Sequence, residues 1–329
     1  MNREKSILIT GGTGSLGQAL TRYIINNIKD IKRLIIFSRD EQKQFKMSQE
    51  YPVSKYPFIR YFIGDVRDKE RLVRAFRGVD FVIHAAAMKH VHIAEYNPDE
   101  CVKTNIGGAQ NVITASIETG VSKVVALSTD KACSPINLYG ATKLTSDKLF
   151  VSANKIKGDN PVTFSVVRYG NVMGSNGSVI PFFKERVATG IFPITDPEMT
   201  RFNISIEQGV NLVFFAIENA KGGELYVPKI PSYNILDVAK AINENCKIDI
   251  VGVRPGEKLH EEMISNSDSH YTYDIGDKYV ILPSFYSDID FLIKNFNAKK
   301  VKANFSYNSK DNLHFETVAS LKQKIKHIE

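Results

Sequence analysis

The chain has 329 residues, of which 43% are hydrophobic and 24% charged, so it can bury a sizeable core in one or two domains. Its formal net charge of +7 comes from lysines and arginines spread along the chain, which makes nucleic-acid binding a weaker interpretation than an anionic substrate or cofactor. The cysteines, Cys101, Cys133 and Cys246, are odd in number and widely spaced, and so indicate neither a disulfide framework nor a metal site.

The first residues, MNREKSILITGGTG, lead from charges directly into a short apolar segment and glycines, without the apolar core of a signal peptide. No apolar run approaches the ~20 residues that a membrane-spanning helix needs. We therefore expect a cytoplasmic protein with no membrane or nucleic-acid partner.

Short apolar segments alternate with helical segments through the first half of the chain. The predicted strands, rich in β-branched residues, cover residues 6–10, 33–38, 59–65, 81–86, 123–129 and 163–170. Helical periodicity lies between them, over residues 16–28, 69–76 and 111–119. Strands that are apolar on both faces and separated by helices predict an α/β protein with a doubly wound parallel sheet, the Rossmann arrangement.

Four glycines, Gly11, Gly12, Gly14 and Gly17, separate the first predicted strand from the first predicted helix. Small residues there let the backbone approach a pyrophosphate, while the helix N-terminus supplies amide donors. The spacing of the last three fits the dinucleotide fingerprint, against the alternative of an ordinary tight turn. The predicted cofactor contacts of this loop are Gly11, Thr13, Gly14, Ser15, Leu16 and Gly17.

The end of the second predicted strand distinguishes NADP from NAD. Ser38 and Arg39 come first and Lys43 follows one helical turn later, and a guanidinium suits a ribose 2′-phosphate. Asp40 leaves an alternative open, because it could bind the ribose hydroxyls of NAD or cap a helix. We predict NADP, with Asp65 and Val66, after the third strand, placed at the adenine.

Tyr139 and Lys143 would lie on one face of a helix if residues 138–150 are helical. A lysine ammonium beside the phenol, together with the positive charge of an oxidised nicotinamide, would lower the pKa of Tyr139 from its ordinary ~10, so that it could deprotonate an alcohol. The alternative is a half-buried tyrosine and a solvated lysine. The position of the pair downstream of a nucleotide loop favours the catalytic interpretation.

Beyond residue 170 the alternation of strands and helices loosens, and proline and glycine become frequent. We expect residues 1–170 to form the NADP-binding Rossmann domain, which also receives elements from about 205–230. Residues 171–329 should form mainly a smaller substrate-binding lobe and a polar C-terminal tail that ends in a helix-like stretch.

Several segments carry a family resemblance. TGGTGSLG, HAAA, LSTDKA and YGATK together resemble the extended short-chain dehydrogenase/reductase superfamily. Longer segments, through nearly the whole chain to about residue 275, resemble the inverting UDP-N-acetylglucosamine 4,6-dehydratases: FSRDEQKQ, FIGDVRDKERL, HAAAMKHV, AEYNPDECVKTNIGGAQNVI, RYGNVMGSNGSVIPFF, PITDPEMTRF and GVRPGEKLHEEMI.

The resemblance implies an activity and a pathway. It implies an NADP-dependent hydro-lyase, active as a homo-oligomer, that converts UDP-N-acetylglucosamine to UDP-2-acetamido-2,6-dideoxy-β-L-arabino-hex-4-ulose with inversion at C5. This is the first step of pseudaminic acid biosynthesis, which supplies flagellin glycosylation.

The same resemblance implies roles for the catalytic residues. Tyr139, with Lys143, would take the proton of the C4 hydroxyl, while Asp130 and Lys131 would handle the C5 proton and the departing C6 hydroxyl. Lys131 stands where retaining relatives carry glutamate, and as a base it needs a pKa lowered from ~10.4 by burial or a nearby cation. The alternative is a contact from Lys131 to cofactor or phosphate without proton transfer.

The remaining contacts are also implied by the resemblance. On the cofactor side they are Ala85, Ala86, Ala87, Lys89, Asn105 and Ser128, beside Tyr139 and Lys143. On the substrate side they are Lys89, Thr129, Asn171, Ser178, Val179, Thr195, Met199, Arg201, Arg254 and Glu257, with the arginines for the diphosphate. A surface ion pair is the alternative for any single arginine. No metal is expected, although His84, His90 and His92 are close in sequence.

Three other functions remain open. A capsule or O-antigen UDP-sugar dehydratase/epimerase shares the first step, but its close relatives often lack the equivalent of Tyr139. A 4-epimerase would leave Asp130 and Lys131 without an elimination to carry out. A catalytically silent NADP-sensing protein would have no need of the full catalytic set.

Overall fold

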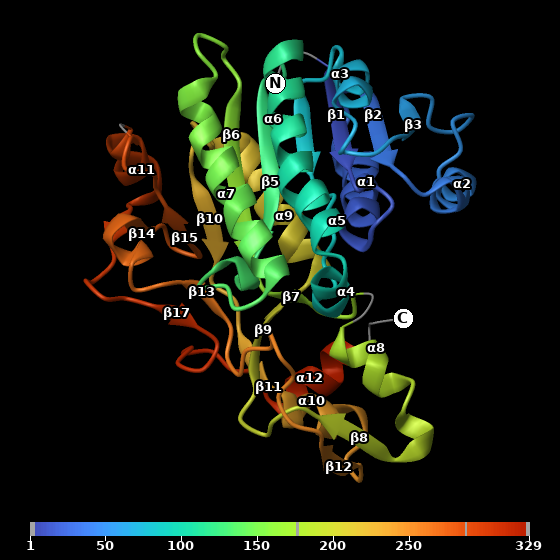
Figure 1. The fold of residues 1–329 in the computed structure, drawn as a ribbon, viewed down its shortest axis with the longest axis vertical. Coiled ribbons are helices and arrows are strands. Elements are labelled where there is room, and N and C mark those ends of the chain that lie inside the picture. The colour runs from blue at the N-terminus through green and yellow to red at the C-terminus, as the bar shows by residue number, and fades with distance from the viewer. Residues whose placement is uncertain (1–3, 176–177, 287, 327–329) are drawn as a thin grey trace.

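The computed structural model describes residues 4–175, 178–286 and 288–326, and its centre is a ten-stranded sheet (Figure 1). Parallel strands in the order β10-β6-β5-β4-β1-β2-β3 form most of the sheet, and antiparallel pairing adds β15, β14 and β16 at the β10 edge. The bounds are β1 Lys5–Thr10, β2 Ile31–Ser38, β3 Ile59–Ile63, β4 Phe81–His84, β5 Lys123–Thr129, β6 Thr163–Tyr169, β10 Leu225–Pro228, β14 Thr272–Asp274, β15 Lys278–Ile281 and β16 Lys299–Lys300. The doubly wound parallel sheet predicted from the sequence is confirmed.

Helices cover both faces of this sheet, with α6 and α7 in front of the strands and α9 behind them in Figure 1. Burial on both faces explains why the strands are continuous apolar runs in the sequence, and Leu8, Ile9 and Ile83 are fully buried. The helices around the sheet are α1 Ser15–Asn27, α2 Glu41–Glu50, α3 Lys69–Phe76, α4 Val91–Tyr96, α5 Pro98–Val102, α6 Gly108–Thr119, α7 Leu138–Ile156, α9 Ile206–Asn219 and α11 Ile289–Phe296, with a π-helix, η1, at Lys103–Gly107.

A smaller lobe lies below the sheet in Figure 1 and has its own core, to which Phe183, Phe192 and Val238 contribute. Its strands form small sheets, β11-β9-β7, β12-β8 and β13-β17. The bounds are β7 Asn171–Val172, β8 Ile191–Ile194, β9 Thr200–Ile204, β11 Ser232–Asn234, β12 Lys247–Ile250, β13 Glu262–Ile264, β17 Tyr307–Asn308, α8 Val179–Lys184, α10 Ile235–Ile242 and α12 Val318–Ile325. Short 3-10 helices are η2 Asp130–Ala132, η3 Val187–Thr189 and η4 Asp268–Tyr271.

The chain passes between the two parts more than once. After β7, β8 and β9 in the lobe, α9 and β10 return to the large sheet, and β14, β15 and β16 also join it. The C-terminal segment then contributes β17 and α12 to the lobe, where α12 buries Leu321 and Ile325. Within the described ranges, none of the helices is long and apolar enough to cross a membrane.

Candidate active site

The carboxyl ends of β1, β4, β5 and β6 bring the predicted site segments to one edge of the large sheet. Thr10 pairs with His84 across β1 and β4, and Thr129 pairs with Tyr169 across β5 and β6. The glycine loop, the alanines after His84, the Asp130–Lys131 dipeptide and Asn171 follow directly from these strand ends. Parallel sheets place their ligand sites at this edge, next to the point where strand order reverses between β1 and β4.

The glycine loop has the close backbone approach that a pyrophosphate site requires. Gly11 has a φ of +66°, and a Cβ built there would lie 2.8 Å from the backbone N of Ala86. A Cβ on Gly17 would lie 2.4 Å from the carbonyl oxygen of Gly12, so that no side chain fits between the loop and α1. Gly14 caps α1 without a side-chain hydrogen bond, which leaves first-turn amides for an anion. These residues therefore fit a bound dinucleotide.

The charged residues after β2 make contacts within the chain. Asp40 Oδ1 accepts a hydrogen bond from the backbone N of Lys43 at 2.9 Å and caps α2. The sequence left two roles open for Asp40, a contact to the ribose of NAD or a helix cap, and in the structure Asp40 is a helix cap. Arg39 is 55% exposed and its Nη1 lies 3.6 Å from Asp65 Oδ2, so its guanidinium can turn toward a ligand at small cost. Ser38 is buried and its Oγ lies 3.1 Å from Thr13 Oγ1.

The loop after β4 is fixed by Asn105, which lies in η1. Asn105 Oδ1 accepts from Met88 N at 2.8 Å, and its Nδ2 donates to Met88 O and Thr142 Oγ1, both at 3.0 Å. Its amide is thus used by protein groups. Asn105 therefore holds the loop of Ala85–Lys89 against α7, and the cofactor contact expected of Asn105 stays a prediction.

The adenine-side residues have structural partners as well. Asp65 accepts from Arg67 Nε at 2.9 Å, and the buried Val66 packs against Gly108, where a Cβ would lie 2.7 Å from Val66 Cγ2.

His84 is buried at the end of β4, and its Nδ1 shares a hydrogen bond of 2.8 Å with Thr10 Oγ1. Burial and the nearby Lys143 lower the pKa of His84 to about 3. No metal-holding group of His, Cys, Asp and Glu is found among the described residues.

Tyr139 and Lys143 lie in the first turns of α7, which begins at the cap Asn137, whose Oδ1 accepts from Gly140 N at 2.7 Å. Both side chains are buried, and Lys143 Nζ donates to Leu127 O at 2.6 Å. Burial raises the pKa of Tyr139 to about 12, although the Lys131 ammonium and a hydrogen bond with Thr129 act to lower it. For the chain alone, burial of the phenol outweighs Lys131 and Thr129, and the lowering predicted from Lys143 together with an oxidised nicotinamide stays a prediction.

A buried ionic network holds α7 against β5 and β6. Ser128 Oγ donates to Asp147 Oδ2 at 2.6 Å, and Arg168 Nη2 lies 3.1 Å from the same oxygen. Ser128, near the end of β5, is thereby connected to α7 through Asp147. Asp147 lies four residues after Lys143, on the same face of the helix. This network fixes the position of α7 relative to the ends of β5 and β6.

Lys131 is surrounded by acceptors. Its Nζ lies 3.0 Å from Asp130 Oδ1, 3.0 Å from Glu261 Oε1 and 3.3 Å from Asn171 Oδ1, so that each ammonium proton has a partner. Burial acts to lower the pKa of Lys131, but the two carboxylates outweigh it and raise the pKa above its ordinary value. The lowered pKa that the sequence requires of Lys131 as a base is therefore wrong for the free chain. Glu261 was not predicted.

Asp130 is fully buried and differs from Lys131 in its hydrogen bonding. Its Oδ1 accepts from Thr129 Oγ1 at 3.0 Å and from Lys131, whereas Oδ2 has no hydrogen-bond partner. Burial raises the pKa of Asp130, and the neighbouring Glu261 raises it further. Asp130 is therefore the carboxyl of this cluster that is best suited to hold a proton.

The lobe brings only some predicted substrate residues to this cluster. Arg201 is buried, and its guanidinium lies 3.9 Å from Glu261 Oε1 and 4.0 Å from Glu257 Oε1. Arg201 thus lies beside the Lys131–Glu261 pair, whereas Arg254 is exposed and its Nη1 lies 3.4 Å from His92 Nε2. The others occupy loop and helix ends of the lobe: Ser178 caps α8, Val179 begins it, Thr195 follows β8 and Met199 precedes β9.

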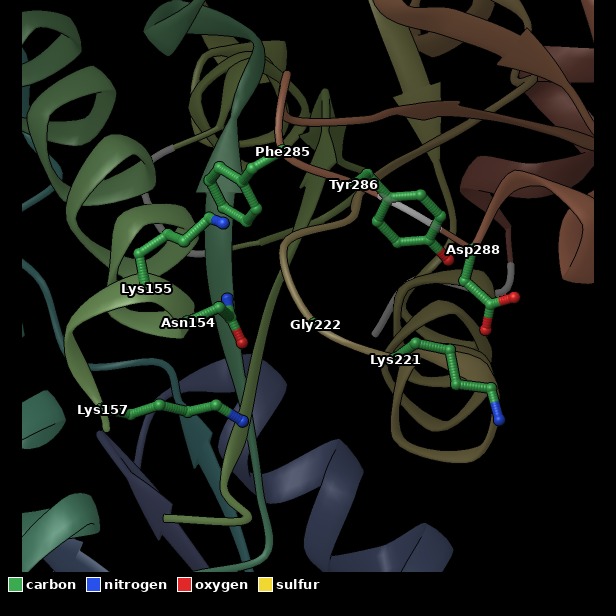
Figure 2. A pocket seen from close by; sticks show the side chains of 8 residues that line it. All are labelled: Asn154, Lys155, Lys157, Lys221, Gly222, Phe285, Tyr286 and Asp288. Atoms are coloured by element: carbon green, nitrogen blue, oxygen red, sulfur yellow. The ribbon is translucent and has the colours of Figure 1, made fainter. Parts of the chain in front are cut away.

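A cavity of about 300 Å³ lies near the amino ends of β6 and β10, away from the carboxyl ends that carry the site (Figure 2). Figure 2 shows Lys155, Lys157 and Lys221 at its rim. These lysines already have protein partners, because Lys157 Nζ donates to Val162 O at 2.6 Å and the other two lie over the rings of Phe285 and Phe291. We assign the cavity no part in the chemistry of the carboxyl edge.

The chain is similar to known proteins over its full length. Residues 7–283 match the family described as polysaccharide biosynthesis protein. A UDP-N-acetylglucosamine 4,6-dehydratase (inverting) of Campylobacter jejuni subsp. jejuni serotype O:2 is 56% identical over 336 residues, covering 100% of this chain and 99% of that protein. A UDP-glucose 4-epimerase of Rickettsia canadensis is 44% identical over 285 residues, covering 84% of this chain and 83% of that protein. The solved structure of Pen from Bacillus thuringiensis is 38% identical, with a TM-score of 0.90 and 98% of each chain covered.

Proposed function

Since the chain belongs to the polysaccharide biosynthesis protein family, within the extended short-chain dehydrogenase/reductase superfamily, we propose that it is a UDP-N-acetylglucosamine 4,6-dehydratase that inverts C5. The observation that carries the proposal is the buried Asp130–Lys131 pair beside Tyr139, because an elimination needs a proton acceptor and a proton donor close to the base that starts the reaction. The full-length similarity to the Campylobacter relative supports the substrate.

The first chemical task of the chain is to remove the C4 hydroxyl proton, which we assign to Tyr139. A bound nicotinamide dinucleotide supplies a hydride acceptor for C4 and later a hydride donor for C6, and the positive charge of its oxidised ring favours the phenolate form of Tyr139. The chain holds Tyr139 in place through Thr129 and through the capped first turn of α7. Burial excludes water from this step.

The second task is the loss of water across C5 and C6. A ketone at C4 acidifies the C5 proton, which passes to the carboxylate of Asp130. The C6 hydroxyl leaves as water with a proton from Asp130, whose pKa is raised by burial. A proton then returns to C5 on the opposite face. The substrate loses two protons, one to Tyr139 and one to Asp130, and two protons return, one in the departing water and one at C5, so that one substrate yields one keto-sugar and one water.

The second candidate is a 4-epimerase, which the name of the Rickettsia relative suggests. An epimerase needs the Tyr139 step alone, whereas Asp130 and Lys131 here form a buried cluster that an epimerase would not use. The mass of the product formed from UDP-N-acetylglucosamine separates the two. A dehydratase gives a product lighter by one water, and an unchanged product mass would favour the epimerase.

The cofactor of the proposal is NADP, and Arg39→Asp should weaken NADP binding much more than NAD binding. The exposed Arg39 lies directly after β2, so the substitution removes a charge-assisted contact and adds repulsion toward a 2′-phosphate. The expected loss is about 2–4 kcal/mol of NADP binding free energy. Titration calorimetry with both dinucleotides measures it, and an unchanged NADP affinity would move the phosphate site to Lys43 or elsewhere.

The pathway and assembly of the proposal come from the resemblance. The product would enter pseudaminic acid biosynthesis for flagellin glycosylation, and the enzyme would act as a homo-oligomer. Loss of flagellin-linked pseudaminic acid on deletion of the gene would support this placement, and an unchanged flagellin glycan would contradict it.

A further inference from the structure

Glu261 contacts the catalytic dipeptide from a different part of the fold. It lies directly before β13 in the lobe, is 2% exposed, and its Oε1 lies 3.0 Å from Lys131 Nζ. Its Oε2 is buried and has no hydrogen-bond partner. Burying a carboxylate costs free energy unless a cation pairs with it, so this position calls for a role at Lys131.

The C-terminal segment fixes the main chain of Glu261. Glu261 N donates to Ser309 Oγ at 2.9 Å, and Ser309 N donates to Glu261 O at 2.8 Å. Ser309 Oγ also lies 2.7 Å from Thr200 Oγ1. The neighbouring Glu262 has a different environment, because its Oε2 accepts from Ser134 Oγ at 2.8 Å. Only the first carboxylate of this pair is directed at Lys131.

Lys131 therefore lies between two carboxyl groups at the same distance, 3.0 Å from Asp130 and 3.0 Å from Glu261. The other charged groups that face Glu261 are Arg201 and Lys258. Burial acts to raise the pKa of Glu261, but these cations and Lys131 outweigh it and lower the pKa. The pKa of Asp130 is instead raised. Glu261 is thus the ionised member of the pair, and Asp130 is the member that can hold a proton.

We propose that Glu261 is a positioning residue, the counter-ion that keeps Lys131 charged and in place while Asp130 gains and loses the proton of the elimination. The inference rests on the proposed dehydratase function. If Asp130 were the single partner of Lys131, its protonation would leave a buried ammonium unpaired, which is unfavourable. With Glu261 present, the proton can bind at the unpartnered Oδ2 of Asp130 and the Lys131–Glu261 pair persists.

The substitution Glu261→Gln tests this by removing the charge at nearly constant shape. Without the second anion the pKa of Asp130 should fall, so Asp130 accepts the C5 proton less readily. We expect dehydration to slow by at least about tenfold, and we expect the acidic limb of its pH profile, where Asp130 is already protonated and cannot accept the C5 proton, to move to lower pH by about one unit. Oxidation at C4, which depends on Tyr139, should continue, so reduced nicotinamide should accumulate up to the enzyme concentration.

The matched control is Glu262→Gln, which should leave the dehydration rate and the pH profile unchanged. Glu261→Asp keeps the charge but withdraws it from Lys131, and should give an intermediate rate and an intermediate limb. If Glu261→Gln does not fold, a folded Glu261→Asp that dehydrates more slowly and accumulates reduced nicotinamide supports the proposal, and one without that accumulation overturns it.

Two results for a folded Glu261→Gln would overturn the inference: a wild-type dehydration rate with an unmoved acidic limb, or an equal loss of C4 oxidation and dehydration. The wild-type enzyme separates this failure from that of the proposed function. A wild type that removes no water from UDP-N-acetylglucosamine contradicts the function itself. A wild type that dehydrates normally beside an unaffected Glu261→Gln contradicts the role of Glu261 alone.

Discussion

Replacing Tyr139 with phenylalanine should slow formation of the 4-keto sugar by ~10²–10⁴-fold, the usual loss when general-base catalysis is removed. The phenyl ring keeps the buried volume of Tyr139 at the start of α7 and gives up only the hydroxyl and its hydrogen bond with Thr129. The fold and dinucleotide binding should therefore persist. Single-turnover absorbance of reduced nicotinamide measures the step directly, with calorimetry as the check on cofactor binding.

A suitable control is Tyr226→Phe, which removes the hydroxyl of another buried tyrosine in the same sheet, on β10. It should oxidise the substrate at the wild-type rate. If Tyr139→Phe also retains near-wild-type turnover, another group takes the C4 proton, and the tyrosine-lacking capsule type of mechanism becomes the better interpretation.

Replacing Lys131 with alanine should have two effects. It leaves Asp130 and Glu261 buried without the cation between them, and removal of one partner of such a cluster costs about 3 kcal/mol in the free energy of unfolding. It should also slow dehydration by ~10²–10⁴-fold, because proton transfer at C5 and C6 loses its ammonium. The variant should still bind both ligands, with any 4-keto sugar and reduced nicotinamide accumulating no further than the enzyme concentration.

Urea unfolding measures the first effect and product formation measures the second. Lys148→Ala is the control, because Lys148 lies on the exposed side of α7. A folded Lys131→Ala that releases dehydrated product at the wild-type rate would assign Lys131 to binding alone, as in the alternative interpretation drawn from the sequence.

The sequence predicts the Rossmann part of the fold well because its signals are local. Strands buried on both faces are apolar runs, and the glycine spacing reports the strand–turn–helix geometry of residues 11–17. The helix predicted over 69–76 has the bounds of α3, whereas the one over 111–119 begins earlier, at Gly108, and the one over 138–150 continues to Ile156. Helix ends depend on capping and packing, which periodicity does not report.

The long-range features of the site were not predictable in this way. Glu261 reaches Lys131 only because the lobe folds back over the strand ends. The sequence around Lys131 therefore shows only one of the two carboxyl groups that raise its pKa, namely Asp130. The glutamate pair in KLHEEMI was the available signal, since adjacent residues entering a strand point to opposite sides. Burial likewise sets the pKa of Tyr139, and burial comes from the assembled fold.

The C-terminal tail shows the same limit. Its polar sequence predicts little beyond a terminal helix, yet Ser309 binds the main chain of Glu261 and α12 packs on α10. The sequence likewise did not predict that the amide of Asn105 holds Met88 and Thr142. These roles follow from contacts between segments that are distant in the sequence.

The most direct test of the proposed function is proton NMR of the wild-type enzyme incubated with UDP-N-acetylglucosamine in deuterated water. The inverting dehydratase should give a 6-deoxy-4-keto sugar that carries the original C4 hydrogen at C6 and a solvent deuteron at C5. It should have the L-arabino configuration from its earliest appearance. A product that first appears in the D-xylo configuration would contradict inversion, and a C4 epimer that keeps its C5 proton would contradict the dehydratase itself.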